Sequence, residues 1–595
     1  MPTWLPSLPN PAQSCCILDT TFGDGVRFLK LWHHWLSNPQ HTGLLYFIGL
    51  HDSLEPDSLR EISPDLPAHL APLAAQLLAQ WPLPVPGLHR LLLDNGRITL
   101  TLALSKSAQP PPLEWLVAVC DFVWIPDDAK SPLPNAAHLA RLSKPGTTLY
   151  SNAKDPSTRA VFERALIGAG FAVQNSPSET APLTATFRAA HSRLTFHQQT
   201  PQTRAAIVIG AGLAGSSAAL SLAKRGWEVT VLERHALPAQ GASGNLAGVL
   251  SPMLSKDDGL AARLARASFL HILAELRDLE STQKPGLWDP CGKLQLARTL
   301  KEDALFQEIV ERHAYPKGYV QYLSREEAAA DLGHAVHAGG WLFPEGGWVD
   351  PAALCEARLH AASNALVRTH CGVLEITYAE QRWTAKDSEG NVLGSAPVLI
   401  LANAFEAAHF APTRSLHFKK VRGQVTHLPA ESLPPLKRVL TRDGYLTPPI
   451  NGVCSLGATY DFDDDRTEVD VASHHANVAR LPELLAGFTP SLAPDSLNGR
   501  VGFRSLTADR LPMIGALPDF AGATGAETLP RIPRLPGLYA VLSLGSRGLL
   551  WSALAGEILA TMLTGEPAPL SGDLLHAVDP ARFLLRQTKK RFPLL

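Results

Sequence analysis

The segment from Ala206 to Arg234, AIVIGAGLAGSSAALSLAKRGWEVTVLER, constrains the fold more than any other part of this sequence. The apolar run AAIVI predicts a buried parallel strand, and the following LAGSSAALSLAKRG predicts a helix. WEVTVLE predicts a second strand, which ends at Glu233. A strand, a glycine turn, a helix and a strand ending in an acid together indicate a dinucleotide-binding unit.

Three glycines in the turn, Gly210, Gly212 and Gly215, form the pattern GxGxxG. Gly210 permits the tight turn, Gly212 lets the backbone approach a pyrophosphate, and Gly215 lets the helix pack closely on the strand. The helix N-terminus offers N–H groups to phosphate, and Glu233 is expected to accept the hydroxyls of an adenosine ribose. The alternative, a glycine turn without a ligand, does not account for the agreement of all these parts.

Two further segments favour FAD over NAD as the ligand. GASGNLAGVLSP follows the first unit and is rich in small and hydrogen-bonding residues, so we expect Ser243 and Asn245 to hold the second phosphate and the ribityl chain. Far downstream, GLYAVLSLGSRGLLWSALAGEILATML predicts a strand, a turn containing Gly545 and Gly548, and a helix whose positive end faces the ligand. A reduced flavin carries negative charge, so the positive end of this helix would favour its binding. The alternative is an ordinary C-terminal βα unit.

The chain is long enough for two or three domains, because 595 residues exceed one ordinary domain. Up to about Gln199, strand-like runs such as GLLYFIGL and RITLTLAL alternate with helical stretches, which predicts an α/β sheet. The polar segment His197–Arg204 predicts a linker. We therefore expect one domain at residues 1–199, a second at 204–580 and a basic tail at 581–595.

Charge and apolar patterning exclude several function classes. The formal net charge of -2 and the pI near 6.9 argue against a DNA-binding protein, while a local basic patch for RNA stays open. The sequence shows neither a signal peptide nor an apolar run of membrane-spanning length, so we expect no membrane association. Seven scattered cysteines without a CxxC pair predict reduced thiols, a cytoplasmic protein and no metal site.

Several motifs occur in an order that is similar to a known family. They are GAGLAGSSAALSLAKRG, GASGNLAGVLSPMLS, GGWLFPEGGWVDPAALC, RGQVTHL, DGYLTP, GRVGFRSLTADRLPMIG and GSRGL. This part resembles the FAD-dependent amine and amino-acid oxidase superfamily. More closely, it resembles the oxidase half of the MnmC family of bifunctional tRNA wobble-uridine modification enzymes. The resemblance implies an FAD-binding Rossmann domain with an interleaved α+β substrate domain.

The resemblance also implies a reaction. The family's substrate is a tRNA wobble uridine that carries a carboxymethylaminomethyl group, and FAD-dependent oxidation removes the carboxymethyl part and leaves a primary amine. Arg504 and Arg547 are candidates for holding the substrate carboxylate near the flavin, because arginine offers a planar fork of donors. Tyr445 is a candidate hydrogen-bond donor. A purely structural role is the alternative for each of the three residues.

Two basic clusters are candidate tRNA surfaces, because such clusters neutralise phosphates. HFKKVRGQ contributes Lys419, Lys420 and Arg422. The segment ARFLLRQTKKRF contributes Arg582, Arg586, Lys589, Lys590 and Arg591. An ordinary solvated basic surface is the alternative for each cluster.

The first half of the chain resembles the S-adenosylmethionine-dependent methyltransferase half of the same family. The main match is LDTTFGDGVRFLKLW, which corresponds to the family's pattern of an acid followed by Thr-Gly-Phe-Gly-Thr-Gly. The match implies that Asp19 binds the ammonium group of the cofactor. It also implies that Gly23 and Gly25 let the backbone approach the methionine part.

The first half departs from the family's pattern at several positions. Thr21 replaces a glycine of the motif, and His51 stands where a ribose-binding glutamate belongs. Ser105 and Lys106 replace an acidic pair expected near the adenine. Losing the partner of a buried polar group costs about 1–3 kcal/mol each time. The departures therefore favour a domain that keeps the fold without methyl transfer.

The family's catalytic segment Asp-Gly-Phe-Ala-Pro appears here as CDFVWIPDDAKSP, in which Asp127 or Asp128 is the candidate replacement. Two interpretations of the first half stay open, an active methyltransferase and an inactive scaffold or tRNA-binding module, and the second is favoured. The alternative for the whole chain is a small-molecule glycine or amine oxidase with a non-catalytic RNA-binding module. The oligomeric state is left open.

Overall fold

The computed structural model describes residues 13–94, 96–105, 112–126, 133–174, 181–189, 203–489, 491–522 and 528–585. The chain forms two compact units. The N-terminal unit consists of residues 1–200 and 561–575, and the C-terminal unit consists of residues 201–560 and 576–595. The segment 561–575 thus groups with the N-terminal unit, although the sequence places it inside the second predicted domain.

The N-terminal unit is built on an eight-stranded sheet. Its central pairs, β4 with β2, β2 with β1, β1 with β5, and β5 with β6, are parallel, while β3, β8 and β7 pair antiparallel. In spatial order the strands are β3 (Gly87–Leu93), β4 (Ile98–Leu104), β2 (Leu45–His51), β1 (Cys15–Asp19), β5 (Cys120–Ile125), β6 (Ser143–Ser151), β8 (Leu183–Phe187) and β7 (Phe171–Val173). The order reverses between β1 and β5, which is where open α/β sheets place ligands.

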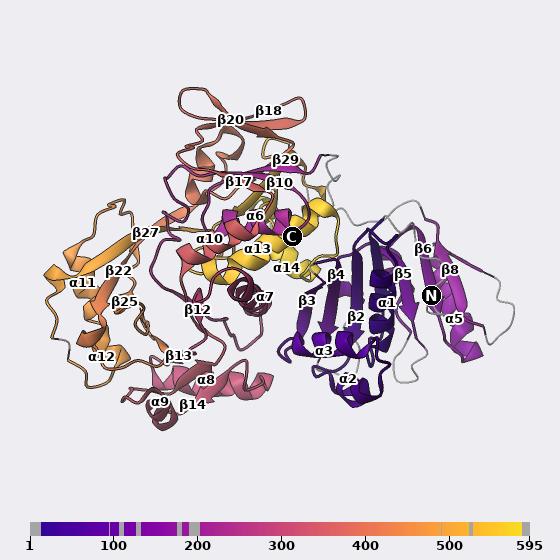
Figure 1. Ribbon diagram of the computed structural model, residues 1–595, viewed down its shortest axis with the longest axis horizontal. Coiled ribbons are helices and arrows are strands. Elements are labelled where there is room, and N and C mark those ends of the chain that lie inside the picture. Colours follow the sequence, from indigo (N-terminus) through magenta and orange to yellow (C-terminus); the bar gives the residue numbers. More distant parts are fainter. Residues whose placement is uncertain are drawn as a thin grey trace, which may run out of the picture. The chain divides into compact units, whose positions relative to one another are not determined.

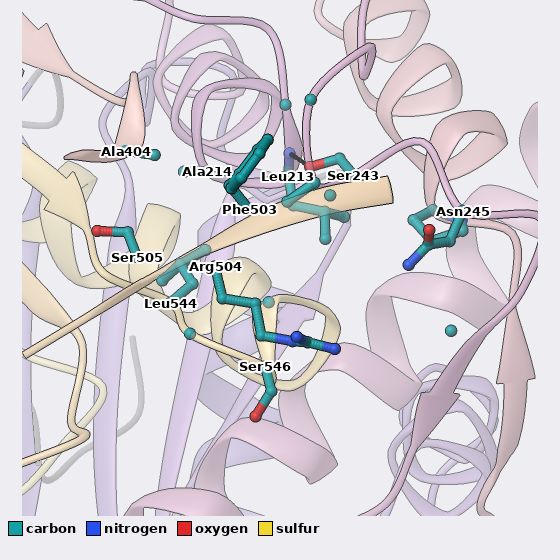
Figure 2. Close-up of a pocket in the computed structure, with 18 of the residues that line it drawn as sticks. Leu213, Ala214, Ser243, Asn245, Ala404, Phe503, Arg504, Ser505, Leu544 and Ser546 are labelled. Atoms are coloured by element: carbon teal, nitrogen blue, oxygen red, sulfur yellow. Dashed lines mark hydrogen bonds between the residues drawn. The ribbon is translucent and has the colours of Figure 1, made fainter. Parts of the chain in front are cut away.

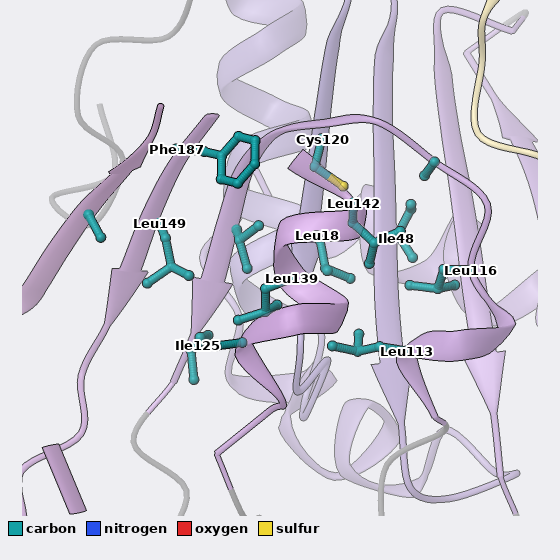
Figure 3. Close-up of a cluster of buried hydrophobic side chains, with 14 of the residues drawn as sticks. Leu18, Ile48, Leu113, Leu116, Cys120, Ile125, Leu139, Leu142, Leu149 and Phe187 are labelled. Carbon is teal, nitrogen blue, oxygen red and sulfur yellow. The ribbon is translucent and has the colours of Figure 1, made fainter. Parts of the chain in front are cut away.

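Helices cover this sheet with apolar side chains. They are α1 (Val26–Ser37), α2 (Asp57–Ile62), α3 (Ala71–Ala79), α4 (Ala136–Arg141) and α5 (Pro156–Gly168). Every residue of β1, β2 and β4 is buried, as expected for strands covered on two faces. Figure 3 shows one of the two resulting clusters, in which Leu139 and Leu142 lie against Leu18, Ile48 and Leu149.

The C-terminal unit contains a six-stranded sheet that begins with the predicted dinucleotide unit (Figure 1). In spatial order its strands are β17 (Ala365–Arg368), β10 (Glu228–Leu232), β9 (Ala205–Ile209), β21 (Val398–Leu401), β29 (Arg534–Leu542) and β28 (Met513–Pro518). All pairs are parallel except β28 with β29. The predicted strands at residues 205–209 and 228–232 are therefore neighbours.

A nine-stranded sheet forms the second layer of this unit. Its strands are β14 (Gln321–Leu323), β15 (Gly340–Phe343), β13 (Lys293–Leu296), β23 (Val439–Thr441), β24 (Tyr445–Leu446), β25 (Val453–Gly457), β22 (Lys419–Pro429) and β26 (Asp461–Phe462), with β27 (Asn498–Leu506) paired to β22. Two three-stranded sheets consist of β11 (Gly248–Leu250), β16 (Gly347–Val349) and β12 (Trp288–Asp289), and of β18 (Glu375–Ala379), β19 (Arg382–Lys386) and β20 (Val392–Ala396).

The helices of the C-terminal unit include one that is buried along its whole length. All residues of α6 (Leu213–Ala223) are buried, because the helix packs against α10 (Pro351–Ala361) and α13 (Gly548–Thr564) as well as the sheet. The others are α7 (Leu260–Thr282), α8 (Leu300–His313), α9 (Arg325–Leu332), α11 (Val471–Val478), α12 (Leu481–Leu484) and α14 (Gly572–Val578). Among the described residues, no helix combines the length and apolar character needed to cross a bilayer.

Candidate functional site

A cavity of about 1330 Å³ lies in the C-terminal unit, between the residues of the glycine turn and those of the nine-stranded sheet. It collects residues from distant parts of the sequence. The predicted site residues that line it are Gly210, Gly212, Glu233, Ser243, Asn245, Tyr445, Arg504, Gly545, Arg547 and Gly548. Figure 2 shows part of the wall, with Ser243, Asn245, Arg504 and Ser546 among the residues drawn.

The glycine turn leaves no room for side chains. Gly210 has φ +103, and a Cβ there would lie 2.8 Å from the carbonyl oxygen of Ala402. A Cβ on Gly212 would lie 3.0 Å from Oγ of Ser243. Gly215 does not line the cavity; a Cβ on it would lie 1.8 Å from the carbonyl oxygen of Gly210, so it permits close packing of α6 on the turn. The turn at Gly210 and the close packing at Gly215 have the geometry predicted from GxGxxG, and the approach of a pyrophosphate at Gly212 stays a prediction.

Glu233 follows the end of β10 and is 6% exposed. Its Oε2 accepts a hydrogen bond of 2.8 Å from the Ala211 N–H, and its Oε1 accepts one of 3.0 Å from the His235 N–H. These two bonds fix the carboxylate at the cavity wall. Each oxygen keeps a further lone pair, so the group remains able to accept the hydroxyls of a ribose.

The loop after β10 is held by contacts that the sequence did not indicate. Oγ of Ser243 accepts a hydrogen bond of 3.1 Å from the Leu213 N–H, at the start of α6 (Figure 2). The Arg500 guanidinium donates to the carbonyl oxygens of Gln240 and Gly241 at 2.8 and 2.7 Å. A Cβ on Gly244 would lie 2.1 Å from that guanidinium, so the glycine makes room for it.

A second turn closes the cavity before α13. Gly545 has φ +60, and its N–H donates to the carbonyl oxygen of Ser505 at 3.1 Å. The N-termini of α6 and α13 thus both border the cavity, and each directs a positive dipole end toward it. The volume, the two helix N-termini, the side-chain-free turn and Glu233 fit an FAD molecule. These residues would hold its phosphates, its adenosine ribose and its isoalloxazine ring.

Arg504 extends from β27 into this cavity. Its Nη1 donates to the carbonyl oxygen of Thr459 at 3.2 Å, and its guanidinium lies 5.4 Å from the centre of the Tyr460 ring. A Cβ on Gly423 would lie 2.0 Å from Nη1, so the bare glycine backbone of β22 makes room for the arginine. Burial lowers the pKa of Arg504 from its ordinary value.

Arg547 lines the cavity from the turn before α13. Burial and the like charge of Arg510 lower its pKa. Tyr445 lies on β24 at the same cavity, where burial raises its pKa to about 12, so it keeps its proton and remains a donor. Among the described residues, neither Arg504 nor Arg547 has a carboxylate within 4 Å. The structure therefore brings the three predicted substrate residues to one cavity, where neither guanidinium is paired directly with a carboxylate of the described residues.

The comparisons with known proteins agree with this geometry. Residues 205–562 match the family model described as FAD dependent oxidoreductase. The chain is 38% identical to the tRNA 5-methylaminomethyl-2-thiouridine biosynthesis bifunctional protein MnmC of Aromatoleum aromaticum, across 98% of this chain and 92% of that protein. The protein of the same name from Burkholderia thailandensis is 40% identical over the same shares. The chain belongs to the MnmC family.

Solved structures confirm the fold of the C-terminal unit. Glycine oxidase from Bacillus cereus superposes with a TM-score of 0.51 at 20% identity, covering 63% of this chain and 97% of the oxidase. Glycine oxidase from Geobacillus kaustophilus superposes with a TM-score of 0.51 at 21% identity, covering 64% of this chain and 99% of that oxidase. These structures confirm the predicted FAD-binding Rossmann architecture, while the family model confirms the predicted FAD cofactor and the relatives confirm the assignment to the MnmC family.

In the N-terminal unit, the residue predicted to bind the ammonium group of S-adenosylmethionine is already paired with an arginine of the chain. Asp19 is 2% exposed at the end of β1. Arg27 Nε donates to its Oδ2 at 2.9 Å, and Arg27 Nη2 donates to Oδ1 at 3.3 Å and also to the Thr21 carbonyl oxygen. Burial raises the pKa of Asp19 to about 6, an effect that Arg27 opposes. A cation of the chain itself thus stands in the position predicted for the ammonium of S-adenosylmethionine.

Aromatic side chains surround the second glycine motif among the described residues. Gly23 and Gly25 have φ +60 and +74, as a glycine turn requires, but a Cβ on Gly25 would lie 3.0 Å from the ring of Phe22. The centre of that ring lies 5.8 Å from the centre of the His51 ring. His51 is 5% exposed at the end of β2, and burial lowers its pKa. A buried neutral imidazole replaces the carboxylate that would bind a ribose. The residues present do not fit S-adenosylmethionine, and Lys106, Asp127 and Asp128 lie outside the described residues.

Two residues of the predicted tRNA surfaces are structural instead. Arg422 is fully buried and donates to the carbonyl oxygens of Arg466 and Glu468. Arg582 is 4% exposed and pairs with Asp509 at 2.9 Å. Both assignments to a phosphate-binding surface are wrong, because neither guanidinium reaches solvent. The remaining members of the tail cluster, Arg586, Lys589, Lys590 and Arg591, lie outside the described residues.

Lys419 and Lys420 lie on β22, and Lys420 is half-buried. Lys420 pairs with Asp465 at 2.6 Å and lies 4.2 Å from the centre of the Phe503 ring. Lys419 is exposed.

The seven cysteines are free thiols. No group of three or more metal-ligating side chains occurs within the part of the chain that the structure describes.

Proposed function

We propose that the C-terminal unit removes the carboxymethyl group from a carboxymethylaminomethyl wobble uridine in tRNA, leaving a primary amine. The MnmC relatives are named for tRNA 5-methylaminomethyl-2-thiouridine biosynthesis, which supports a tRNA substrate. The matching FAD-dependent oxidoreductase family supports the reaction type. When bound, FAD supplies the two-electron acceptor for a hydride.

The substrate side chain is an N-substituted glycine, and its oxidation balances as follows. A hydride leaves the glycine Cα, and the nitrogen lone pair forms a C=N bond. Water adds to this imine, the C–N bond then breaks, and the products are glyoxylate and the primary amine on the nucleoside. Dioxygen takes up the two electrons in the end.

The observation that carries the proposal is the uncompensated positive charge in the cavity. Arg504 is half-buried and Arg547 is exposed; both line the cavity, and neither has a carboxylate within 4 Å among the described residues. Cations that a bound ligand takes out of water require an anionic partner. A substrate carboxylate supplies it, and two planar guanidinium groups would hold that carboxylate in one orientation. Tyr445 would donate a further hydrogen bond.

We infer further that the reaction of this chain ends at the primary amine. The Arg27–Asp19 pair and the buried His51 replace the groups that would hold S-adenosylmethionine in the N-terminal unit. Methylation of the amine then requires a separate N-methyltransferase. The N-terminal unit serves as a scaffold or as part of the tRNA surface.

Nucleoside mass spectrometry on the full-length, FAD-loaded protein tests this function. Incubated with tRNA that carries carboxymethylaminomethyl-uridine, the protein should convert that nucleoside to the primary amine and release one glyoxylate per amine. Added S-adenosylmethionine should produce no methylated nucleoside.

Two outcomes would contradict these proposals separately. Turnover of free glycine or sarcosine without turnover of the tRNA would favour the small-molecule amine oxidase. Appearance of the methylated nucleoside would show that the N-terminal unit is an active methyltransferase.

A further inference from the structure

A buried lysine that the sequence analysis did not single out lies at the same cavity. Lys293 is the first residue of β13, is 4% exposed and lines the cavity with Arg547. Its Nζ donates to Oε1 of Gln295 at 2.6 Å and lies 5.1 Å from the centre of the Phe343 ring. No carboxylate lies within 4 Å of Nζ among the described residues. The amine is therefore buried without a compensating negative charge.

The surroundings of Lys293 favour the neutral amine. Burial, together with the like charge of Arg547, lowers the pKa of Lys293 to about 7. The neighbouring strands add no charge, because β15 presents Phe343 and β23 presents Val439 opposite this residue. On its own strand, Gln295 offers an uncharged acceptor. At neutral or higher pH, much of Lys293 thus has a free lone pair inside the cavity.

The proposed oxidation needs a proton acceptor at this place. A secondary alkyl amine is mostly protonated in neutral water, and a hydride leaves Cα only when the nitrogen lone pair is free to form the C=N bond. In an N-substituted glycine, one carbon separates the nitrogen from the carboxylate. A carboxylate held by Arg547 therefore brings the nitrogen close to the part of the cavity that Lys293 lines.

We propose that Lys293 accepts the proton that the substrate amine loses before its oxidation. The N–H bond of the substrate ammonium breaks, its electron pair stays on the nitrogen, and a new N–H bond forms on Nζ. The step involves no change of oxidation state and needs no further reactant. Gln295 positions the acceptor by holding one N–H of the lysine. This role rests on the proposed function, because it requires the amine in the cavity of the C-terminal unit.

Three variants of the full-length, FAD-loaded protein separate a proton acceptor from a fixed charge. Lys293→Met removes the amine at similar length. Lys293→Arg keeps a positive charge and a donor to Gln295 but accepts no proton near neutral pH. Lys301→Met makes the same change as the first variant at an exposed position on α8 and serves as the matched control.

The first measurement is the anaerobic rate of flavin bleaching by the modified tRNA from about pH 6 to about pH 10. In the wild type and in Lys301→Met, the bleaching rate should increase with pH through an apparent pKa near neutrality and then reach a plateau. At neutral pH, Lys293→Met and Lys293→Arg should both be about 100-fold slower or more, and both should recover as pH rises toward the substrate amine's own pKa. Full activity of Lys293→Arg, or a loss of equal size at every pH, would overturn the proposal.

The second measurement does not depend on turnover. The visible absorbance of the bound flavin, titrated without substrate over the same pH range, should show a transition near neutrality in the wild type and in Lys301→Met. Both Lys293 variants should lack it. If the tRNA bleaches no flavin at any pH, the proposed function fails, and this titration still decides whether Lys293 changes charge at the flavin cavity. An identical titration in all four proteins would overturn the role of Lys293.

Discussion

At the scale of single residues, three cations line the cavity together with the carboxylate of Glu233. Arg504, Arg547 and Lys293 reach the cavity from different parts of the sequence; Lys293 is buried, Arg504 is half-buried and Arg547 is exposed. Motif resemblance indicated the two arginines, because each lies in a recognisable segment. Lys293 was missed because a lysine at the start of a short strand, KLQL, reads as an exposed strand end.

Removal of either cavity arginine should weaken turnover without releasing the cofactor. We expect Arg547→Ala and Arg504→Ala each to lower kcat/KM about 10- to 100-fold, because a charged hydrogen bond contributes about 1.5–3 kcal/mol. The visible flavin absorbance should be retained. Steady-state kinetics on the modified tRNA measures the loss, with Arg325→Ala on the exposed start of α9 as the control. Unchanged kinetics in an Arg547→Ala protein would remove that residue from the substrate site.

The same scale shows why basic clusters in a sequence are weak predictors of a nucleic-acid surface. Arg422 and Arg582 occur in lysine- and arginine-rich segments, yet both are buried and satisfied by backbone carbonyls or a carboxylate. A sequence shows the charge of a residue but not the acids and carbonyls that the fold brings to it. Burial of these two residues depends on contacts more than 40 positions away.

At the scale of elements, the dinucleotide unit was predictable and its packing partners were not. The pattern GxGxxG placed β9, α6 and β10 correctly, because each glycine has a local geometric task. The contact of α6 with α13 joins segments more than 300 residues apart, and Oγ of Ser217 donates to the Ser552 carbonyl oxygen at 2.7 Å. Local sequence patterns carry no information about such a pairing.

A single methyl group should disturb this helix contact. A Cβ on Gly556 would lie 2.3 Å from Oγ of Ser217 and 2.6 Å from its backbone oxygen, so Gly556→Ala must push α13 away from α6. Overpacking of this kind costs about 1–3 kcal/mol, and the shift of two helix N-termini should weaken FAD binding. Denaturant unfolding and FAD titration measure both effects.

The control for this substitution is Gly168→Ala at the end of α5, where a Cβ meets no atom within 4 Å. The free energy of unfolding of that variant should equal the wild-type value or exceed it by about 0.4–1 kcal/mol. Equal stability of the Gly556→Ala and wild-type proteins would show that the two helices separate without cost.

At the scale of the whole molecule, the two units should respond to different ligands. FAD in hundredfold excess over its dissociation constant stabilises the state that binds it by about 2.7 kcal/mol. We expect differential scanning calorimetry to show that FAD raises the transition of the C-terminal unit, while S-adenosylmethionine moves neither transition. A rise with S-adenosylmethionine would contradict the assignment of the Arg27–Asp19 pair as its replacement.

The N-terminal unit is completed by residues 561–575, which come late in the sequence. Arg90 on β3 pairs with Glu566 at 2.9 Å and donates to the Pro567 carbonyl oxygen at 2.7 Å, while the Ala568 N–H donates to the Val117 carbonyl oxygen at 2.8 Å. More than 400 residues separate the two members of this ion pair, so Arg90 can pair with Glu566 only after those residues have been synthesised. Loss of the first 200 residues would therefore remove the Arg90 partner of Glu566, so the segment 561–575 depends on the N-terminal unit for its packing, independently of any methyl transfer.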